Sequence, residues 1–329
     1  MEIVGFALRR LLVAIPVLLV STFLIFLAVA KSGDPLTELR ERQPPVPPHT
    51  IAAEEARLGL DQPVLQRYWN WLTGVIQGDL GPSVDRNADI GLEIGSRLGI
   101  TMRFVLIAML IAAVLAILVG VVSAVRQYSW LDYLFTSTGF LFLAMPSFWL
   151  AVLLKQGGIE LNALAGQTLI YTGGDSSVIP PPTLGGRIAD LAGHMILPTI
   201  TLVLINFAAW SRFQRSSMLD VLGSDYVKLA TAKGLRRRTV LRKYALRTAL
   251  TPLVTVIALD FTAVFAGAVV TETVFQWRGM GDYLLESING RDVNAVMAWL
   301  LVAAVAVVLF NLFADILYAA LDPRIRRVR

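Results

Sequence analysis

Cysteine is absent from this sequence of 329 residues, and histidine occurs only twice, at His49 and His194. The absence of cysteine excludes disulfide bonds and thiolate metal sites. Two histidines that lie far apart in the sequence also argue against a histidine-rich metal site. We therefore expect this chain to bind no metal ion.

Catalytic motifs are missing as well. The sequence contains no G-K-S or G-K-T triplet, so it has no phosphate-binding loop for ATP. It also lacks the H-E-x-x-H and G-x-S-x-G patterns of two hydrolase classes. We therefore expect no catalytic residues and no enzymatic activity of its own. Any ATP-driven process would need its ATPase on another chain.

Charged residues are scarce, at 16% of the chain, whereas 56% of the residues are hydrophobic. The mean hydropathy is +0.65. A soluble domain has about 25% charged and about 45–50% apolar residues, so the composition predicts an integral membrane protein. The net charge of +5 then raises the question of which side of the membrane carries the basic residues.

Six apolar segments approach or exceed the roughly 20 residues that a membrane-spanning helix needs. They are residues 11–30, 101–125, 134–154, 195–211, 251–270 and 294–318. We expect Pro146 to kink the third segment. The fifth is expected to begin with Thr251 as the N-cap and Pro252 as the first helical residue. The first segment is longer than the apolar core of a signal peptide, which favours a span. The predicted fold is all-α with six transmembrane helices.

Basic residues predict the orientation. With the N-terminus in the cytoplasm, the cytoplasmic segments hold 17 of the 29 Lys and Arg residues and five acidic residues. Cytoplasmic loops of membrane proteins carry an excess of Lys and Arg. Both termini are therefore predicted to be cytoplasmic. Outside the spans, residues 52–80 have a helical pattern, in which Tyr68, Trp69 and Trp71 suit an interfacial aromatic belt.

The most basic segment, residues 225–250, contains eight Lys or Arg residues and one acid. Two helical patterns flank Gly234, where a helix can end at positive φ. The pattern positions are Tyr226, Leu229, Ala230 and Lys233, then Leu241, Tyr244, Ala245, Thr248 and Ala249. We expect a helix–turn–helix on the cytoplasmic face. Charge and periodicity alone allow binding to anionic lipid or docking of a soluble protein. Nucleic acid is not expected, since no domain presents the segment to a duplex.

Two carboxylates lie within the predicted spans. A charge at the bilayer centre costs about 2.5–3.5 kcal/mol, so Asp260 in the fifth span needs a cavity or a partner. It either lines a transport pathway or makes a structural bond to a neighbouring helix. Asp315 lies near the cytoplasmic end of the sixth span, where it is expected to pair with arginines such as Arg324 or to reach interfacial water.

Small residues at helical spacing suggest close helix packing. Ala108, Ala112, Ala116 and Gly120 form one ridge of the second span, and the fifth span contains the run AVFAGAVV. The ridge can serve a subunit interface or ordinary packing within the subunit. We favour packing within the subunit.

Several segments together resemble a known family. They are ILPTITL (196–202), RFQRSSMLDVLGSDYVKLATAKGL (212–235), VVTETVFQWRGMGDYLLESINGRD (269–292) and LFNLFADILYAALDPRIRR (309–327). The chain resembles permease subunits of ATP-binding-cassette importers, and most closely the first permease of the dipeptide/oligopeptide family. The resemblance implies a type I importer permease fold. It divides the chain into the first span with an external segment (1–95), a transmembrane core (96–320) with the coupling loop at 212–250, and a basic tail (321–329).

The resemblance also implies the partners. These are a second permease, two ATPase subunits that bind ATP and Mg²⁺, an external binding protein and the lipid of a bacterial cytoplasmic membrane. This chain itself would hold no cofactor. The residues carried over as the ATPase-docking element are Asp225, Tyr226, Lys228, Ala230, Ala232, Lys233, Gly234 and Leu235. The small Ala230 and Ala232 are expected to permit close approach to a groove of the ATPase.

The chain departs from the family pattern at several places, among them Lys228, Leu229, the stretch 244–247 and Asp260. Lys228 stands where the general loop pattern has Glu, and it either contacts the ATPase or lies over lipid phosphates. Asp260 stands where an uncharged polar residue is expected, which makes it a candidate pathway residue. The resemblance leaves an importer of nickel or haem as the alternative substrate class. A self-contained channel or secondary transporter is the alternative of a different class.

Overall fold

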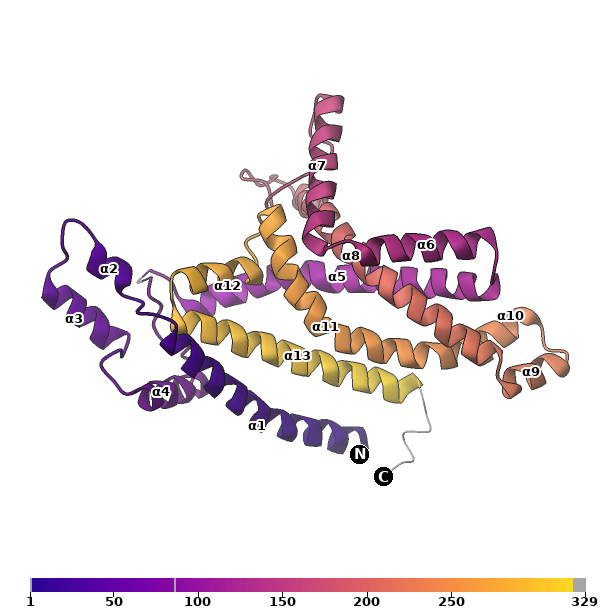
Figure 1. The fold of residues 1–329 in the computed structure, drawn as a ribbon, viewed down its shortest axis with the longest axis horizontal. Helices are drawn as coiled ribbons and strands as arrows, with labels where there is room; N and C mark the ends of the chain where they lie inside the picture. Colours follow the sequence, from indigo (N-terminus) through magenta and orange to yellow (C-terminus); the bar gives the residue numbers. More distant parts are fainter. Residues whose placement is uncertain (1, 86, 322–329) are drawn as a thin grey trace. The chain divides into compact units, whose positions relative to one another are not determined.

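The computed structural model describes residues 2–85 and 87–321, and the elements in these ranges are all helical (Figure 1). The first half contains α1 (Glu2–Lys31), α2 (Thr37–Glu41), α3 (Pro48–Arg57), α4 (Val64–Ile76), α5 (Ile90–Val125), α6 (Trp130–Ala144) and α7 (Ser147–Ala165). The second half contains α8 (Leu184–Leu222), α9 (Asp225–Ala232), α10 (Arg237–Thr239), the π-helix η1 (Val240–Leu246), α11 (Arg247–Phe275), α12 (Met280–Asn289) and α13 (Val293–Leu321).

These helices belong to two compact units. The core unit contains Thr101–Trp277 with short pieces from both ends of the chain, and the N-terminal unit contains Val4–Ile100 and Arg278–Val308. Residues 322–329, including Arg324, and the side chain of Asp315 lie outside what the structure describes. The predicted division into residues 1–95, 96–320 and 321–329 stays a prediction.

Five helices are long and apolar enough to cross a membrane, and α6 with α7 makes a sixth span if the bent pair is counted as one. Five of the six predicted apolar segments are therefore confirmed as long helices, and the third corresponds to the bent pair of α6 and α7. The kink expected at Pro146 is instead a complete break, with α6 and α7 meeting at 105°. Met145 and Pro146 both have extended backbone. Proline lacks the N–H that the helix would need and disfavours helical geometry in the residue before it, which explains the break.

The fifth span begins earlier than predicted. Thr251 is not an N-cap and Pro252 is not the first helical residue, because η1 runs directly into α11 and places Pro252 inside the helix. Ala245, Ala249 and Leu253 are all completely buried. This stripe at four-residue spacing extends the helix upstream of the proline. The predicted second helix of the basic loop is thus continuous with the fifth span.

The N-terminal unit packs α4 against α1. Tyr68 and Trp71 are buried in a cluster with Phe26. The Tyr68 hydroxyl donates a hydrogen bond to the carbonyl oxygen of Leu19 over 3.1 Å. Their assignment to an interfacial aromatic belt was therefore wrong, and only Trp69 of the three aromatic residues is well exposed, at 63%. The helix expected over residues 52–80 is also divided, since α3 ends before Gly59, which has a φ of +65°.

The ridge of small residues on α5 lies inside the core unit. Ala108, Ala112 and Ala116 are at most 1% exposed. A Cβ atom on Gly120 would meet Gln214 Cβ at 2.8 Å and the Ser211 carbonyl oxygen at 2.9 Å. The ridge is therefore buried within the chain, as we favoured, and at Gly120 it packs against α8. Gly267 of the fifth span differs, since a Cβ there would meet nothing within 4 Å.

Replacing Gly120 with Ala is expected to destabilise the protein by about 1–3 kcal/mol, because the added methyl group overpacks the contact between α5 and α8. The measurement is thermal unfolding of the detergent-purified protein, followed by intrinsic tryptophan fluorescence. Gly267→Ala is the matched control, because a Cβ there meets open space. Equal unfolding midpoints for the two variants would contradict the close packing at Gly120.

Candidate functional site

The basic loop forms the predicted helix–turn–helix between α8 and α11 (Figure 1). Ser224 has extended backbone before α9, and its carbonyl oxygen accepts hydrogen bonds from the backbone N–H groups of Val227 and Lys228. Gly234 follows α9 with a φ of +75°, which favours glycine. The predicted turn at Gly234 is confirmed.

One face of α9 is anchored in an apolar cluster. Val227 and Ala230 are 5% and 4% exposed. The cluster, here called the loop cluster, consists of Ala124, Met218, Val227, Ala230, Val240, Ala245 and Ala249. Ala230 therefore packs inward and cannot provide the expected close approach to an ATPase groove. Its spacing from Val227 is that of a buried helical stripe, and this stripe could have been recognised in the sequence.

The opposite face of α9 and the following turn are open to solvent. Tyr226, Leu229 and Leu235 are 44%, 56% and 38% exposed. Leu229 was not among the predicted docking residues, although it is the most exposed of the three. The remaining predicted docking residues on this face are also exposed: Asp225, Lys228, Ala232, Lys233 and Gly234. Together the exposed residues define what we call the loop face.

Lys228 on the loop face lies 3.5 Å from Asp225, and both side chains are largely in solvent. Exposed ion pairs contribute about 0–1 kcal/mol to stability. This contact therefore leaves the ammonium group of Lys228 available to a partner. The structure brings the loop residues together, but their role as a docking element stays a prediction.

A buried ion pair lies among the helices next to the loop cluster. Arg215 on α8 donates from Nε to Oδ1 and from Nη2 to Oδ2 of Asp132, each over 2.7 Å. The Ser123 hydroxyl also donates to Asp132, as does the backbone N–H of Tyr128 over 3.0 Å. The Asp132 side chain is only 5% exposed. The pair thus joins the end of α5 and the beginning of α6 to α8.

The sequence analysis did not predict this ion pair. It counted Asp132 and Arg215 only among the charges of the cytoplasmic segments. The signal was weak but present. Asp132 is an isolated acid between two apolar spans, and such a charge needs a nearby cation if it is buried.

Asp260 in α11 has a structural partner. Its Oδ2 atom accepts a hydrogen bond from Nε1 of Trp210 over 2.7 Å, and Trp210 is completely buried. The second oxygen accepts no hydrogen bond among the described residues. The structure therefore contains the helix-to-helix bond that was one of the two interpretations of Asp260. The other oxygen of the half-buried carboxylate is still available for a contact in a pathway.

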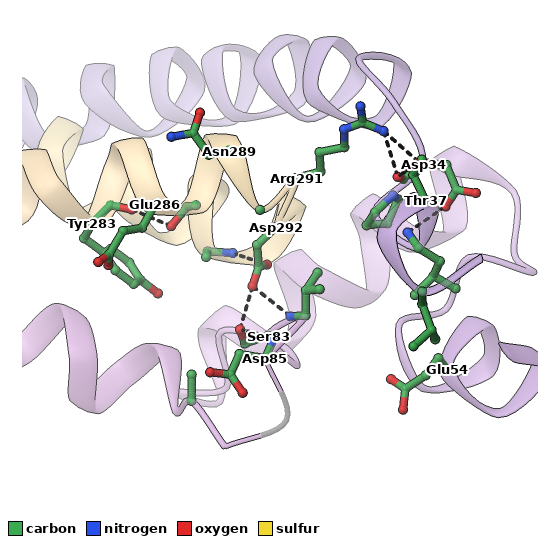
Figure 2. Close-up of a pocket in the computed structure, with 18 of the residues that line it drawn as sticks. Asp34, Thr37, Glu54, Ser83, Asp85, Tyr283, Glu286, Asn289, Arg291 and Asp292 are labelled. Atoms are coloured by element: carbon green, nitrogen blue, oxygen red, sulfur yellow. Dashed lines mark hydrogen bonds between the residues drawn. The ribbon is translucent and has the colours of Figure 1, made fainter. Parts of the chain in front are cut away.

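The N-terminal unit contains a pocket of about 1170 Å³ that the sequence did not predict (Figure 2). Asp34, Glu41, Glu54, Asp85, Glu93, Glu286 and Asp292 line it, together with Arg42, Arg97 and Arg291. The excess of carboxylates would favour a cationic group. No group of residues arranged to hold a metal ion occurs in the described part of the chain.

Much of the pocket lining makes structural bonds. Asp292 accepts hydrogen bonds from the Ser83 hydroxyl over 2.6 Å and from the backbone N–H of Val84 over 2.8 Å (Figure 2). Arg97 forms ion pairs with Glu93, Asp282 and Glu286. Burial, together with the negative charges of Asp292 and Glu93, raises the pKa of Tyr283 to about 12. These bonds join two segments of the N-terminal unit that lie far apart in the sequence.

Asp132→Asn is expected to lower the stability by about 3 kcal/mol, because it leaves the guanidinium of Arg215 largely buried without its counter-charge. Thermal unfolding of the purified protein measures this loss. Asp225→Asn is the matched control, since it removes a carboxylate from an ion pair in solvent and is expected to change stability by less than about 1 kcal/mol. A loss no larger than that of the control would mean that the buried pair contributes little.

Comparisons with known proteins identify the family. Residues 116–327 match the family described as binding-protein-dependent transport system inner membrane component, and residues 3–87 match its N-terminal family. The oligopeptide transport system permease protein OppB of Mycobacterium tuberculosis is 38% identical over 97% of this chain and 98% of its own length. AppB of Bacillus subtilis, an oligopeptide permease, is 37% identical over 98% of this chain and 99% of its own length. DppB of Escherichia coli, a dipeptide permease, is 36% identical over 98% of this chain and 98% of its own length.

Solved structures of importers share the fold. An inward-facing MetNI methionine ABC transporter matches with a TM-score of 0.54 at 14% identity, covering 70% of this chain and 96% of that chain. An amino acid ABC transporter solved with histidines matches with a TM-score of 0.51 at 11% identity, covering 69% and 94%. The type I importer permease fold is thereby confirmed. The chain belongs to the family of binding-protein-dependent transport system inner membrane components.

Proposed function

We propose that the chain is one permease subunit of an ATP-driven importer that carries dipeptides or oligopeptides into the cytoplasm. The observation that supports this most is an identity of 36–38%, along nearly the whole chain, with relatives named as oligopeptide or dipeptide permeases. The open loop face and the membrane-spanning helices agree with a subunit that passes motion from a soluble partner to a pathway.

The complete transporter contains a second related permease, two ATP-binding-cassette ATPase subunits and an external binding protein. ATP and Mg²⁺ bind to the ATPases, and this chain contributes no catalytic residue. The complex lies in the cytoplasmic membrane of a bacterium, with both termini of this chain inside. In this orientation the loop face points toward the cytoplasm, where the ATPases lie.

The loop face is the proposed docking surface. Tyr226, Leu229 and Leu235 supply apolar area, and Lys228 and Lys233 surround it with positive charge. Exposed apolar groups rimmed by polar residues are typical of protein interfaces. We therefore favour docking of an ATPase over simple contact with lipid. Ala230 contributes by anchoring α9 in the loop cluster.

The loop cluster provides a route for the motion. It contains residues of α5, α8, α9, η1 and α11, so a displacement of α9 acts on three long helices at once. The ion pair between Asp132 and Arg215 adds α6 to this set. ATP-driven closure of the two ATPases would then change how these helices are tilted, and the pathway would open to the other side.

The function is tested with the complex that co-purifies with this chain from its own membrane. Reconstituted in vesicles with its binding protein, it is expected to accumulate a labelled tripeptide only when ATP is present. Peptide flux through the isolated chain without ATP would instead indicate a channel.

In the same vesicles, Gly234→Val is expected to uncouple the two activities. Valine strongly disfavours the φ of +75° that the turn requires, so α9 would be presented in a different direction. We expect ATP hydrolysis to continue while peptide uptake per ATP falls roughly tenfold. Gly223→Ala is the control, because Gly223 has a φ of −76° and a Cβ there makes ordinary contacts at 3.6 Å. Normal uptake by the Gly234 variant would refute the coupling role.

Substitutions at Asp260 separate its two interpretations. Asp260→Asn removes the charge but keeps an oxygen that can accept the bond from Trp210, whereas Trp210→Phe removes the bond and keeps the charge. A charge-assisted contact is worth about 1.5–3 kcal/mol, so its loss corresponds to roughly tenfold slower uptake or more. We expect this effect for Asp260→Asn and a smaller one for Asp315→Asn. Normal uptake by Asp260→Asn, with impaired Trp210→Phe, would assign Asp260 a purely structural role.

A further inference from the structure

A groove of about 540 Å³ runs between α6 and α8 of the core unit, outside the loop cluster and the pocket of the N-terminal unit. The polar residues Thr136, Arg212, Arg215 and Ser216 line one end of the groove, which Phe213 lines as well. The other end is apolar and is lined by Phe140, Leu143 and Ala209. The proposed function assigns no role to this groove.

The helices α6 and α8 run antiparallel here. The polar residues of both helices therefore lie at one end of the groove, and the apolar residues lie at the other. The bond between Asp132 and Arg215 aligns the beginning of α6 with the C-terminal half of α8. From that pair, α6 leads through Thr136 to Leu143, and α8 leads back through Arg212 to Ala209. Seven residues of helix cover about 10 Å, so the groove changes from polar to apolar over roughly that length. An amphiphilic molecule likewise joins a polar group to an apolar chain.

The polar end carries an uncompensated positive charge. Asp132 neutralises Arg215, but no carboxylate in the described part of the chain forms an ion pair with Arg212. The guanidinium of Arg212 lies 4.3 Å from the centre of the Phe140 ring, which holds it over the groove. Thr136 and Ser216 place hydroxyl groups at the same end, and neither donates a hydrogen bond to another described residue.

The sequence places the groove beside the end of an apolar segment. Arg212 directly follows the apolar stretch 195–211 of α8, and it is exposed. Basic pockets between transmembrane helices on the cytoplasmic side attract anionic lipid headgroups. The position of Arg212 therefore matches the depth of a phosphate, and the apolar end extends toward the acyl chains.

We propose that this groove binds an anionic phospholipid of the cytoplasmic leaflet. The phosphate pairs with Arg212 and accepts hydrogen bonds from the hydroxyl groups of Thr136 and Ser216. An acyl chain lies along Phe140, Leu143 and Ala209. The site is independent of the transported solute, and only the assignment to the cytoplasmic leaflet rests on the proposed orientation.

The test uses the transporter complex, purified through this chain from its own membrane and transferred into nanodiscs of equal parts phosphatidylglycerol and phosphatidylcholine. After extraction into mild detergent, mass spectrometry measures how much of each lipid stays bound. We expect the wild type to retain phosphatidylglycerol preferentially. Arg212→Gln is expected to reduce this preference about fivefold, the equivalent of about 1 kcal/mol for one basic residue near a membrane surface.

Two further variants make the test specific. Arg126→Gln removes an equally exposed arginine from the turn between α5 and α6, outside the groove, and is expected to retain the lipid preference. Ala209→Phe fills the apolar end without changing any charge, and it is expected to displace the lipid. The proposal is overturned if Arg212→Gln retains lipid like the wild type or if Arg126→Gln loses it equally. It is also overturned if Arg212→Gln keeps the lipid but loses the second permease, which would make the groove a protein interface.

Discussion

A lipid bilayer offers no hydrogen-bond partners to the peptide backbone, so the chain must satisfy its own N–H and C=O groups wherever it crosses the membrane. The long helices of both units meet this requirement. The break at Pro146 has a specific chemical cause, because proline cannot donate a backbone bond. Outside the spans, the turn of the basic loop lies at Gly234, which tolerates positive φ. The positions of these interruptions determine which helices can move separately.

The same solvent makes buried polar side chains costly unless they are paired. In the core unit Asp132 is held by Arg215, and Asp260 is held by Trp210. Each pair joins α8 to a different neighbour, α6 in one case and α11 in the other. A buried ion pair adds little net stability compared with apolar packing. We interpret both pairs as the contacts that set the register of α8.

Features that depend on neighbouring residues could be predicted from the sequence, whereas a contact between distant residues could not. Apolar length revealed five spans and the apolar segment of the bent pair α6 and α7, and the single glycine between two helical patterns revealed the turn of the loop. The early start of α11 was missed because Pro252 was read as a start signal, although the buried stripe of Ala245 and Ala249 overrides it. The bond between Asp132 and Arg215 was missed for a different reason. It joins residues that are distant in sequence, and no periodicity relates them.

The π-helix η1 has a mechanical consequence. A π-turn accommodates one residue more than an α-turn, so conversion of η1 to α-helix would shift the register by one position. One position corresponds to about 100° of rotation about the helix axis. Because η1 continues directly into α11, such a step would rotate the part of α11 that follows η1. The loop could then act on the beginning of the span by torsion of the backbone, without a relay of side chains.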